Sequence, residues 1–448
     1  MEDSAFATAC ELAAAIREHE VSAVEVLEVF LDRFERHNPS LNAIVTLGEE
    51  GAMEKVREAD AALERGESWG PLHGVPITLE DCHATAGIRS TWGGHPSLAD
   101  HVPFEDSVVA ARLKAAGAVV FGKTNGPEVW GPEGVFDRTN NTWDLERTPG
   151  GSSSGPGAAL AAGLTPLDIG LDTLGSIQSP AHCCGVFGMR PTERRVSLKG
   201  SFFIDPIPKF HIMSVAGPMA RSVEDLRLAL RLIAGPDHRD PSVPPLPWRD
   251  APAPTMSDLR LAWSPTLPGV PVPGEMRVDI EELAGELGRR GAHVQQCLPE
   301  LDFAEQHDFA QRTFELIAGT FGEAEMPTSL DDYLTALHRR EAFVVQWDRF
   351  FREWDALICP VEPTVAERHD DEVILVDGEP VTEAQRDIPS MSSPVSGCPT
   401  VVIPLTLSHD GLPIGVQVMG SRWDDERLLA IAESLSEMAG GFRRPPGY

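Results

Sequence analysis

Two serines stand in stretches whose residue types could support nucleophilic catalysis. Ser152 lies in GGSSSGPG, residues 150–157, a Gly- and Ser-rich loop that opens a segment of small residues. Ser176 follows Gly175 in DTLGSIQSPA, residues 172–181, a turn before another expected helix start. Successive backbone N–H groups at such a turn can point at one spot and form an anion or oxyanion site. The chain between the two serines is short enough to fold back and bring them together.

Each of these stretches also has a simpler interpretation. A Gly- and Ser-rich loop on its own is more often a turn than a site. The loop is not a phosphate-binding P-loop, because no Gly-Lys-Ser/Thr follows it, and no G-x-S-x-G nucleophile elbow encloses Ser176. A third feature is GVPITLED, residues 74–81, where a short apolar strand stops at Glu80 and Asp81. A strand that ends in this way could present an acid to a polar pocket.

Composition excludes several classes of function. The chain has 448 residues and a formal net charge of -32, which disfavours binding to nucleic acid or to an anionic membrane. Its seven cysteines are odd in number and scattered, which favours a reducing compartment over a disulfide framework. The acidic N-terminus does not look like a signal peptide, and no apolar run reaches the ~20 residues of a membrane span. We therefore expect a cytoplasmic protein.

Helical and strand-like segments alternate along the chain. Ser22 and Glu25 form a capping box before a helix that we expect to end at Asn38-Pro39. Apolar strand-like runs include AVVFG, PLDIGL, TVVIPLTL and IGVQVMG, and helical patterns separate many of them. This alternation predicts an α/β fold with a largely parallel or mixed sheet.

The segment from Gly150 to Thr192 resembles the amidase signature family. That family has a Gly-Gly-Ser-Ser-Gly-Gly loop, a Pro-Leu strand, an Asp-x-Gly-Gly-Ser-Ile-Arg turn, then Pro-Ala, Cys-Gly-Val and Lys/Arg-Pro-Thr, and most of this pattern is present without a gap. LNAIVTL, LHGVPITLED, GAVVFGKTNGPEVW, SVAGPMARSVEDL and GLPIGVQVMG stand in family order as well. The resemblance implies one compact α/β domain over 1–448, with a many-stranded mixed sheet flanked by helices. Its signature core would span about 70–235, a Pro-rich excursion 236–255, and the C-terminal part of the same domain 256–448.

The same resemblance implies a mechanism, in which a Ser–cis-Ser–Lys triad hydrolyses a small-molecule amide through an acyl-enzyme. Ser176 matches the nucleophile, and Ser152 matches the bridging serine that follows a cis peptide bond. The backbone N–H groups of Thr173, Leu174 and Gly175, together with that of Ser176, match the oxyanion hole. No cofactor, metal, nucleic acid or membrane partner is implied, and a homodimer is the expected assembly.

Glu80 occupies the position where the family has its triad lysine. The lysine is thought to act as a neutral amine, because burial lowers its pKa. A glutamate is shorter, and burial raises its pKa instead. It could still take a proton through the bridging serine, although its negative charge would oppose a developing oxyanion. Lys123, in FGKTN, is a structural position in the family, and its substitution for the missing amine is conceivable.

Three further departures from the family pattern lie close to the same site. Leu174 stands where the family usually has Gly and would be strained if the position requires a positive φ. Gln178 replaces an Arg, and Ser154 replaces a loop Gly. These changes suggest a reshaped or relaxed site, whereas both serines and their spacing are kept.

Several alternatives therefore stay open. The chain is an amidase with an altered or impaired proton shuttle, or an inactive amidase-fold pseudoenzyme that serves as a binding or partner module. Acyl transfer to an amine, or a role as one subunit of an amidotransferase, is a further alternative. Cys82 beside His83 is a lesser candidate nucleophile. His182-Cys183-Cys184 invites a metal interpretation, but no second pair at zinc spacing accompanies it.

Overall fold

The computed structural model describes residues 2–126, 134–201, 212–318 and 329–448. The helices are α1 (Ala9–Arg17), α2 (Ala23–Leu41), α3 (Glu49–Glu64), α4 (Val108–Ala115), α5 (Ser154–Ala161), α6 (Gln178–Cys184), α7 (Val223–Ile233), α8 (Gly274–Arg289), α9 (Phe303–Ala318), α10 (Leu330–Phe350), α11 (Glu383–Asp387), α12 (Ser392–Ser396) and α13 (Asp425–Ala439). The strands are β1 (Ile44–Leu47), β2 (Pro76–Glu80), β3 (Val119–Thr124), β4 (Leu167–Asp172), β5 (Phe187–Arg190), β6 (Val215–Ala220), β7 (Arg260–Trp263), β8 (His293–Gln296), β9 (Ala356–Pro360), β10 (Ile374–Val376), β11 (Glu379–Val381), β12 (Thr400–Leu407) and β13 (Pro413–Gly420).

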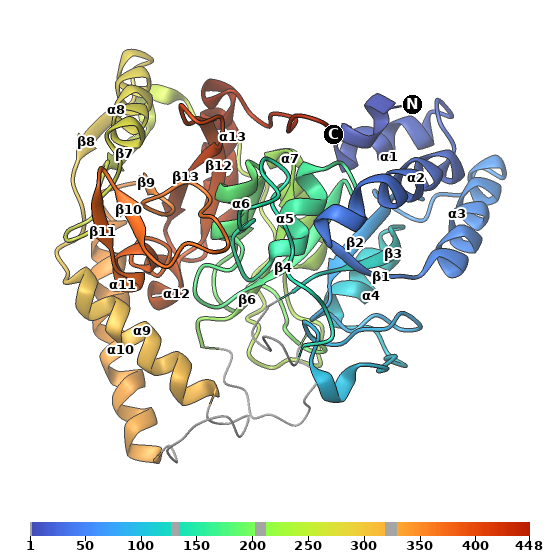
Figure 1. The fold of residues 1–448 in the computed structure, drawn as a ribbon, viewed down its shortest axis with the longest axis horizontal. Coiled ribbons are helices and arrows are strands. Elements are labelled where there is room, and N and C mark those ends of the chain that lie inside the picture. The colour runs from blue at the N-terminus through green and yellow to red at the C-terminus, as the bar shows by residue number, and fades with distance from the viewer. Residues whose placement is uncertain (1, 127–133, 202–211, 319–328) are drawn as a thin grey trace.

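An eight-stranded mixed sheet runs through the middle of the molecule, in the order β4-β6-β5-β12-β13-β9-β7-β8 (Figure 1). Its pairs are antiparallel from β4 to β9, and β9-β7 and β7-β8 are parallel. The strands β12 and β13 come last in the chain, yet they lie between β5 and β9. Residues 236–255 contain no helix or strand, and the sheet has strands from both sides of this segment. The predicted mixed α/β class is thus confirmed.

Helices cover both faces of this sheet, and the alternation of side chains along β12 shows how. Val402 packs in one cluster with Ala181 of α6 and Leu160 of α5. Its neighbours Val401 and Ile403 join the main core, which contains residues of α7 and α13. Because successive side chains of a strand point to opposite faces, α5 and α6 lie on one face and α7 and α13 on the other. The loops that open α5 and α6 are therefore held against the centre of the sheet.

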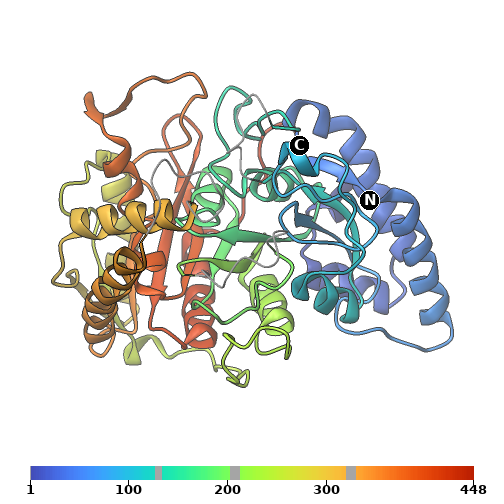
Figure 2. The same cartoon turned by 90° about the horizontal axis from the view of Figure 1, so that it is seen from below.

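A second, three-stranded sheet in the order β1-β3-β2 lies on the N-terminal side of β4 (Figures 1 and 2). Strands β2 and β3 are parallel, with Glu80 opposite Thr124, and every side chain of both strands is buried. Hydroxyls of Thr78 and Thr124 both donate to Asp168 Oδ2 in β4, at 2.5 and 2.9 Å. The end of β2 consequently faces β4 and the loop that precedes α5.

The helix α2 begins as predicted but ends later than predicted. Ser22 and Glu25 form the expected capping box. The helix continues through Pro39 to Leu41, where Asn42 adopts a left-handed conformation. The Asn38 side chain explains the difference, because its oxygen accepts hydrogen bonds from the N–H groups of Ala43 and Ile44. These bonds fix the chain just beyond the helix, so a proline in the last turn is tolerated.

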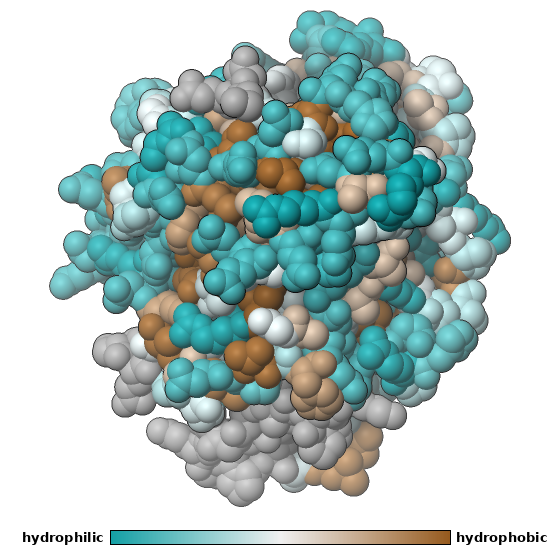
Figure 3. Space-filling model, turned by 90° about the vertical axis from the view of Figure 1, so that its right-hand side faces the viewer, coloured by the Kyte–Doolittle hydropathy of each residue, from teal (hydrophilic) through white to brown (hydrophobic). Residues whose placement is uncertain are grey.

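The last residues of the chain return to the N-terminal helices, as both ribbon views show (Figures 1 and 2). Phe442 stacks on Phe6 with ring centroids 6.2 Å apart, and Tyr448 lies against His37 at 5.0 Å. Hydrophilic residues cover most of the face seen in Figure 3, with apolar residues between them. Within the described ranges, no helix is both long enough and apolar enough to cross a bilayer.

Candidate active site

The side chain of Glu80 is fully buried at the end of β2. Its Oε2 accepts a hydrogen bond of 2.7 Å from Ser153 Oγ and one of 2.9 Å from the backbone N–H of Leu171. Its Oε1 has no hydrogen-bond partner among the described residues. A buried carboxyl oxygen without a partner is uncommon and requires an explanation.

The Gly- and Ser-rich loop lies beside the Ser176 turn. The peptide bond between Gly151 and Ser152 is cis, as the resemblance implies. The N–H of Ser153 donates to the carbonyl oxygen of Ser176 at 3.1 Å, so this bond ties the loop to the turn. Gly150 must be a glycine, because its φ is +77° and a Cβ would lie 2.6 Å from Ser179 Oγ. The two serines that the sequence singled out are therefore brought to adjoining segments.

A buried ion pair organises the turn that contains Ser176. Asp172 pairs with Arg190 at 2.7 Å, and both side chains are fully buried. The Asp172 carboxylate also accepts the N–H groups of Gly175, at 3.0 Å, and Ile177, at 2.8 Å. An acid at a strand end that collects N–H groups of the next turn is a common structural device. Neither Asp172 nor Arg190 was singled out in the sequence, where only the position of Asp172 next to the turn hinted at this role.

This arrangement corrects the expected oxyanion hole. The N–H of Gly175 points to Asp172 and is not available to a ligand. The N–H groups of Thr173, Leu174 and Ser176 have no hydrogen-bond partner within the part of the chain that the structure describes. Gly175 still has a conformational role, since its φ is +104° and a Cβ would meet Ser390 Cβ at 2.7 Å.

Comparison with known proteins identifies the family. The amidase family profile matches residues 25–318 and 311–429. The chain belongs to the amidase family. A glutamyl-tRNA(Gln) amidotransferase subunit of Symbiobacterium thermophilum is 32% identical over 464 residues, which are 92% of this chain and 93% of that protein. Indoleacetamide hydrolase of Bradyrhizobium diazoefficiens is 32% identical over 471 residues, which are 97% of this chain and 86% of that protein.

Solved amidase-family structures share the fold. A chain from a vestigial protein complex that reveals the origins of an s-triazine catabolic enzyme superposes with a TM-score of 0.86 at 28% identity, covering 98% of this chain and all of that one. The 6-aminohexanoate cyclic dimer hydrolase complexed with substrate gives 0.82 at 26% identity and covers 99% of both chains.

Leu174 is not strained in this member of the amidase family. Among the described residues with a positive φ, the turn contributes only Gly175. The expectation that Leu174 is forced into a left-handed conformation is therefore wrong. Its side chain packs against an apolar cluster that includes Met213, Phe309 and Met391. An apolar wall thus begins two residues before Ser176.

Gln178 links the turn to helix α12. Its Nε2 lies 3.4 Å from Asp172 Oδ2 and 3.3 Å from the carbonyl oxygen of Ser390, and its Oε1 accepts from Ser393 Oγ at 3.3 Å. These bonds are long but numerous, so Gln178 bridges Asp172 and α12. Ser154, the other polar departure, lies 3.4 Å from Thr139 Oγ1.

Lys123 does not join the site. In the parallel pairing of β2 and β3 it stands opposite Leu79, whereas Glu80 stands opposite Thr124. Alternation therefore directs Lys123 to the other face of the small sheet. There its Nζ donates to the carbonyl oxygen of His83 at 2.5 Å and to Thr85 Oγ1 at 3.1 Å. Burial lowers the pKa of Lys123 to about 8, but its amine is held away from Ser153.

Burial dominates the electrostatics of Glu80 and raises its pKa from 4.5 to about 8. The hydrogen bonds from Ser153 and Leu171 oppose this rise, the nearby Asp168 adds to it, and Lys123 lowers it. Burial also raises the pKa of Asp168 to about 7. The site therefore contains two carboxyl groups that hold protons near neutral pH.

The neighbouring Asp81 has a structural role. Its carboxylate accepts the N–H groups of Thr91 and Gly93, both at 2.9 Å, and the hydroxyl of Thr91 at 2.5 Å. These bonds fold residues 91–93 over the end of β2. The two acids that follow the strand thus differ, since only Glu80 points toward the serines' loop.

The cysteine and metal alternatives lose support. Burial raises the pKa of the Cys82 thiol well above its ordinary value and lowers that of His83 to about 3, so neither thiolate nor imidazolium is favoured. His182, Cys183 and Glu362 gather ligand atoms within 4.8 Å of one another. However, His182 Nδ1 accepts the N–H of Gly415 at 3.0 Å, and Nε2 lies 2.8 Å from the carbonyl oxygen of Thr364. Both ring nitrogens are already engaged, which leaves none for a metal.

Replacing Ser153 by alanine is expected to destabilise the fold by about 1–3 kcal/mol, because a buried carboxyl loses one of its two donors. The cost grows with pH, since the lost bond stabilises the charged form of Glu80 most. Urea unfolding at pH 6 and pH 9 measures both effects. Ser154→Ala is the matched control, because its hydroxyl makes only a 3.4 Å contact with Thr139. Equal costs for the two variants would contradict the assignment.

Proposed function

We propose that the protein hydrolyses the carbon–nitrogen bond of a small amide through Ser176, with Glu80 in place of the usual amine as proton shuttle. The observation that carries this proposal is the turn from Asp172 to Ser176. Its N–H groups at Thr173, Leu174 and Ser176 are unpaired among the described residues, beside the half-buried Ser176. Donors prepared in this way stabilise a developing oxyanion, and each typically contributes ~100- to 1,000-fold in rate.

The proposed reaction has two halves. Ser176 Oγ attacks the amide carbon while its proton passes through Ser152 toward Glu80, and the C–N bond breaks as the amine leaves with that proton. Water then attacks the acyl-enzyme, gives a proton back along the same path and restores Ser176. A pKa of about 8 suits Glu80 to this exchange, because a group that titrates near the working pH can both accept and donate.

The apolar wall next to the turn supports a substrate class. Leu174 and the cluster it joins would face one side of the bound amide and favour an apolar acyl or amine portion. The similarity to an indoleacetamide hydrolase is in keeping with such a substrate. We therefore propose aryl or branched aliphatic amides ahead of short polar ones.

A second candidate is a catalytically inactive member that serves as a binding or partner module. The observation that favours it is the hydrogen bond of Glu80, which is made to Ser153 and not to Ser152. The similarity to glutamyl-tRNA(Gln) amidotransferase subunits also leaves room for action within a complex. The two candidates differ in whether Ser176 is chemically activated.

Labelling with a fluorophosphonate probe tests the proposal. The parent protein is expected to form an adduct at Ser176, located by peptide mass spectrometry, and Ser176→Ala is expected to lose both labelling and turnover. Ser68→Ala, which removes an exposed serine, is the control and should label like the parent. Turnover that survives in Ser176→Ala would sink the hydrolase proposal, and a folded parent that never labels would favour the inactive module.

A further inference from the structure

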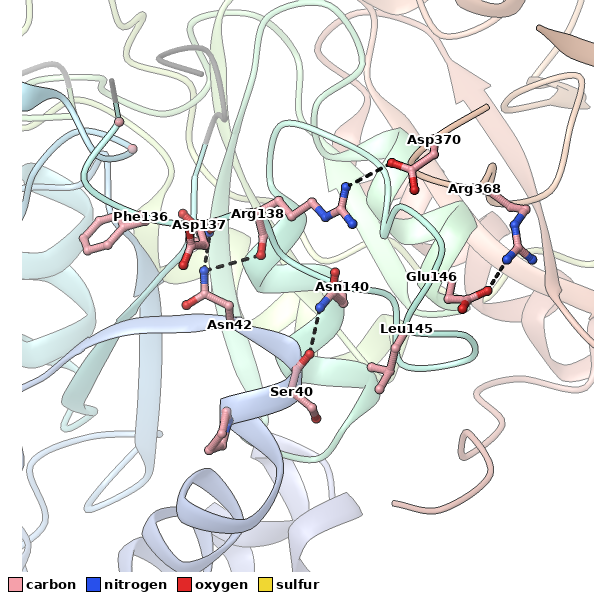
Figure 4. Close-up of a pocket in the computed structure, with 14 residues that line it drawn as sticks. Ser40, Asn42, Phe136, Asp137, Arg138, Asn140, Leu145, Glu146, Arg368 and Asp370 are labelled. Carbon is pink, nitrogen blue, oxygen red and sulfur yellow. Dashed lines mark hydrogen bonds and ion pairs between the residues drawn. The ribbon is translucent and has the colours of Figure 1, made fainter. Parts of the chain in front are cut away.

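A polar pocket of about 880 Å³ opens between the end of α2, residues 134–146 and residues 368–370 (Figure 4). Asn42 points into it and donates to the carbonyl oxygens of Asp137 and Arg138, and Arg138 reaches toward Asp370. The outer lining is exposed, with Asp370 94% accessible. The inner lining includes Gly93 and Asn125, which are buried. The pocket thus runs from the surface to buried backbone.

Two glycines separate the inner end of this pocket from Glu80. Gly126 follows the pocket residue Asn125, and a Cβ on Gly126 would lie 3.3 Å from Glu80 Oε1 and 3.3 Å from the Cα of Gly93. Gly93 is held in place by its N–H bond to Asp81. We name Gly93 and Gly126 the glycine window. No side chain fills the window, so its contents decide what Glu80 Oε1 contacts.

The oxygen that faces the window is the one without a partner. Glu80 Oε2 has two donors, whereas Oε1 is fully buried and unpaired among the described residues. Buried polar atoms that lack a protein partner are commonly satisfied by bound water. The pocket is polar, so water can reach its inner end.

We propose that a water molecule enters from this pocket, binds Glu80 Oε1 at the glycine window and carries protons between Glu80 and solvent. When the carboxyl loses its proton, the O–H bond at Oε1 breaks and the proton passes through the bound water to the pocket. The charge that remains is stabilised by Ser153 and Leu171 at Oε2. The proposal does not depend on the proposed hydrolytic function.

The other charged groups around Glu80 do not provide this route. Asp168 is committed to Thr78 and Thr124 on β2 and β3. Lys123 points to the far face of the small sheet, and Asp81 is occupied by residues 91–93. Within the described ranges, the glycine window is the side of Glu80 on which no protein donor stands.

A high-resolution crystal structure of the full chain at pH 7 is the direct test. The expected result is an ordered water within hydrogen-bond distance of Glu80 Oε1, with further waters leading into the pocket. An empty or apolar-packed window in that structure would overturn the proposal.

Gly126→Ala supplies a second test, which measures the pKa of Glu80 without any assay of activity. The methyl group would displace the water, so the carboxylate would lose a donor. The quantity measured is the difference in unfolding free energy between Glu80 and Glu80→Gln forms across pH. We expect Gly126→Ala to move the midpoint of this difference upward by about one pH unit. Gly285→Ala, on α8 with open space around its Cβ, is the control and should leave the midpoint unmoved. An unmoved midpoint in Gly126→Ala would refute the water site.

Discussion

Glu80→Lys is expected to raise amide hydrolysis by about 100- to 10,000-fold, the range that a well-placed general base contributes. The position is buried, which lowers the pKa of a lysine there and makes the neutral amine accessible. The N–H of Leu171 points at the same spot and favours a group that can accept a hydrogen bond. A neutral amine has one lone pair for this purpose and keeps its protons for the serines. Initial rates over simple aliphatic and aryl amides, for parent and variant together, measure the gain.

Two variants control this experiment. Glu80→Arg introduces a cation that cannot give up its proton, so it should not reproduce the gain. Glu80→Lys combined with Ser176→Ala should return to background, because the nucleophile is gone. If the lysine variant is no faster than the parent, the carboxyl is not a defective substitute for an amine.

Glu80→Gln is expected to remove a large pH dependence of stability. The folded-state pKa of Glu80 is about 8, above its ordinary value of 4.5, because burial disfavours the charged form. Between these two values the folded protein holds a proton that the unfolded chain has released. Its contribution to stability is therefore complete below about pH 4.5 and is lost as the pH rises through about 8. The parent should lose about 1.4 kcal/mol per pH unit relative to Glu80→Gln across this window.

Urea unfolding of parent and variant at several pH values from 5 to 9 gives this difference directly. Taking the difference cancels the contributions of other groups to first order, although Asp168, whose pKa is also raised, is close enough to couple to Glu80. Glu64→Gln, on the exposed side of α3, is the control and should run parallel to the parent. A constant difference between parent and Glu80→Gln would mean that Glu80 is ionised at every pH tested.

The sequence predicted the α/β class and the neighbourhood of the two serines, because both follow from local pattern. Alternating apolar segments predict a mixed sheet, and a short loop-strand-turn can return Ser176 to Ser152. The order of the sheet could not be predicted in this way, since β12 lies beside β5 across a separation of about two hundred residues. The end of α2 was also misplaced, because the Asn38 cap is a side-chain contact that propensities do not encode.

Within the candidate site, the sequence located Glu80 but not its bonds. Every residue of β2 is buried, so hydrophobic periodicity does not reveal which face each side chain takes. That is why the separation of Lys123 from Glu80 became clear only in the folded chain. The role of Asp172 was missed for a related reason. It acts through Arg190 and through N–H groups, and none of these partners can be recognised by spacing alone.

The placement of β12 and β13 has a consequence for how the protein is made. Strands β5 and β9 flank this hairpin, so the large sheet stays in two pieces until residues 400–420 have left the ribosome. Until then, strand edges on both pieces are unpaired and open to association with other chains. Closure also requires contacts between distant parts of the sequence, which slows folding. The growing chain therefore depends on protection of these edges late in synthesis, well after the segment with both serines has emerged.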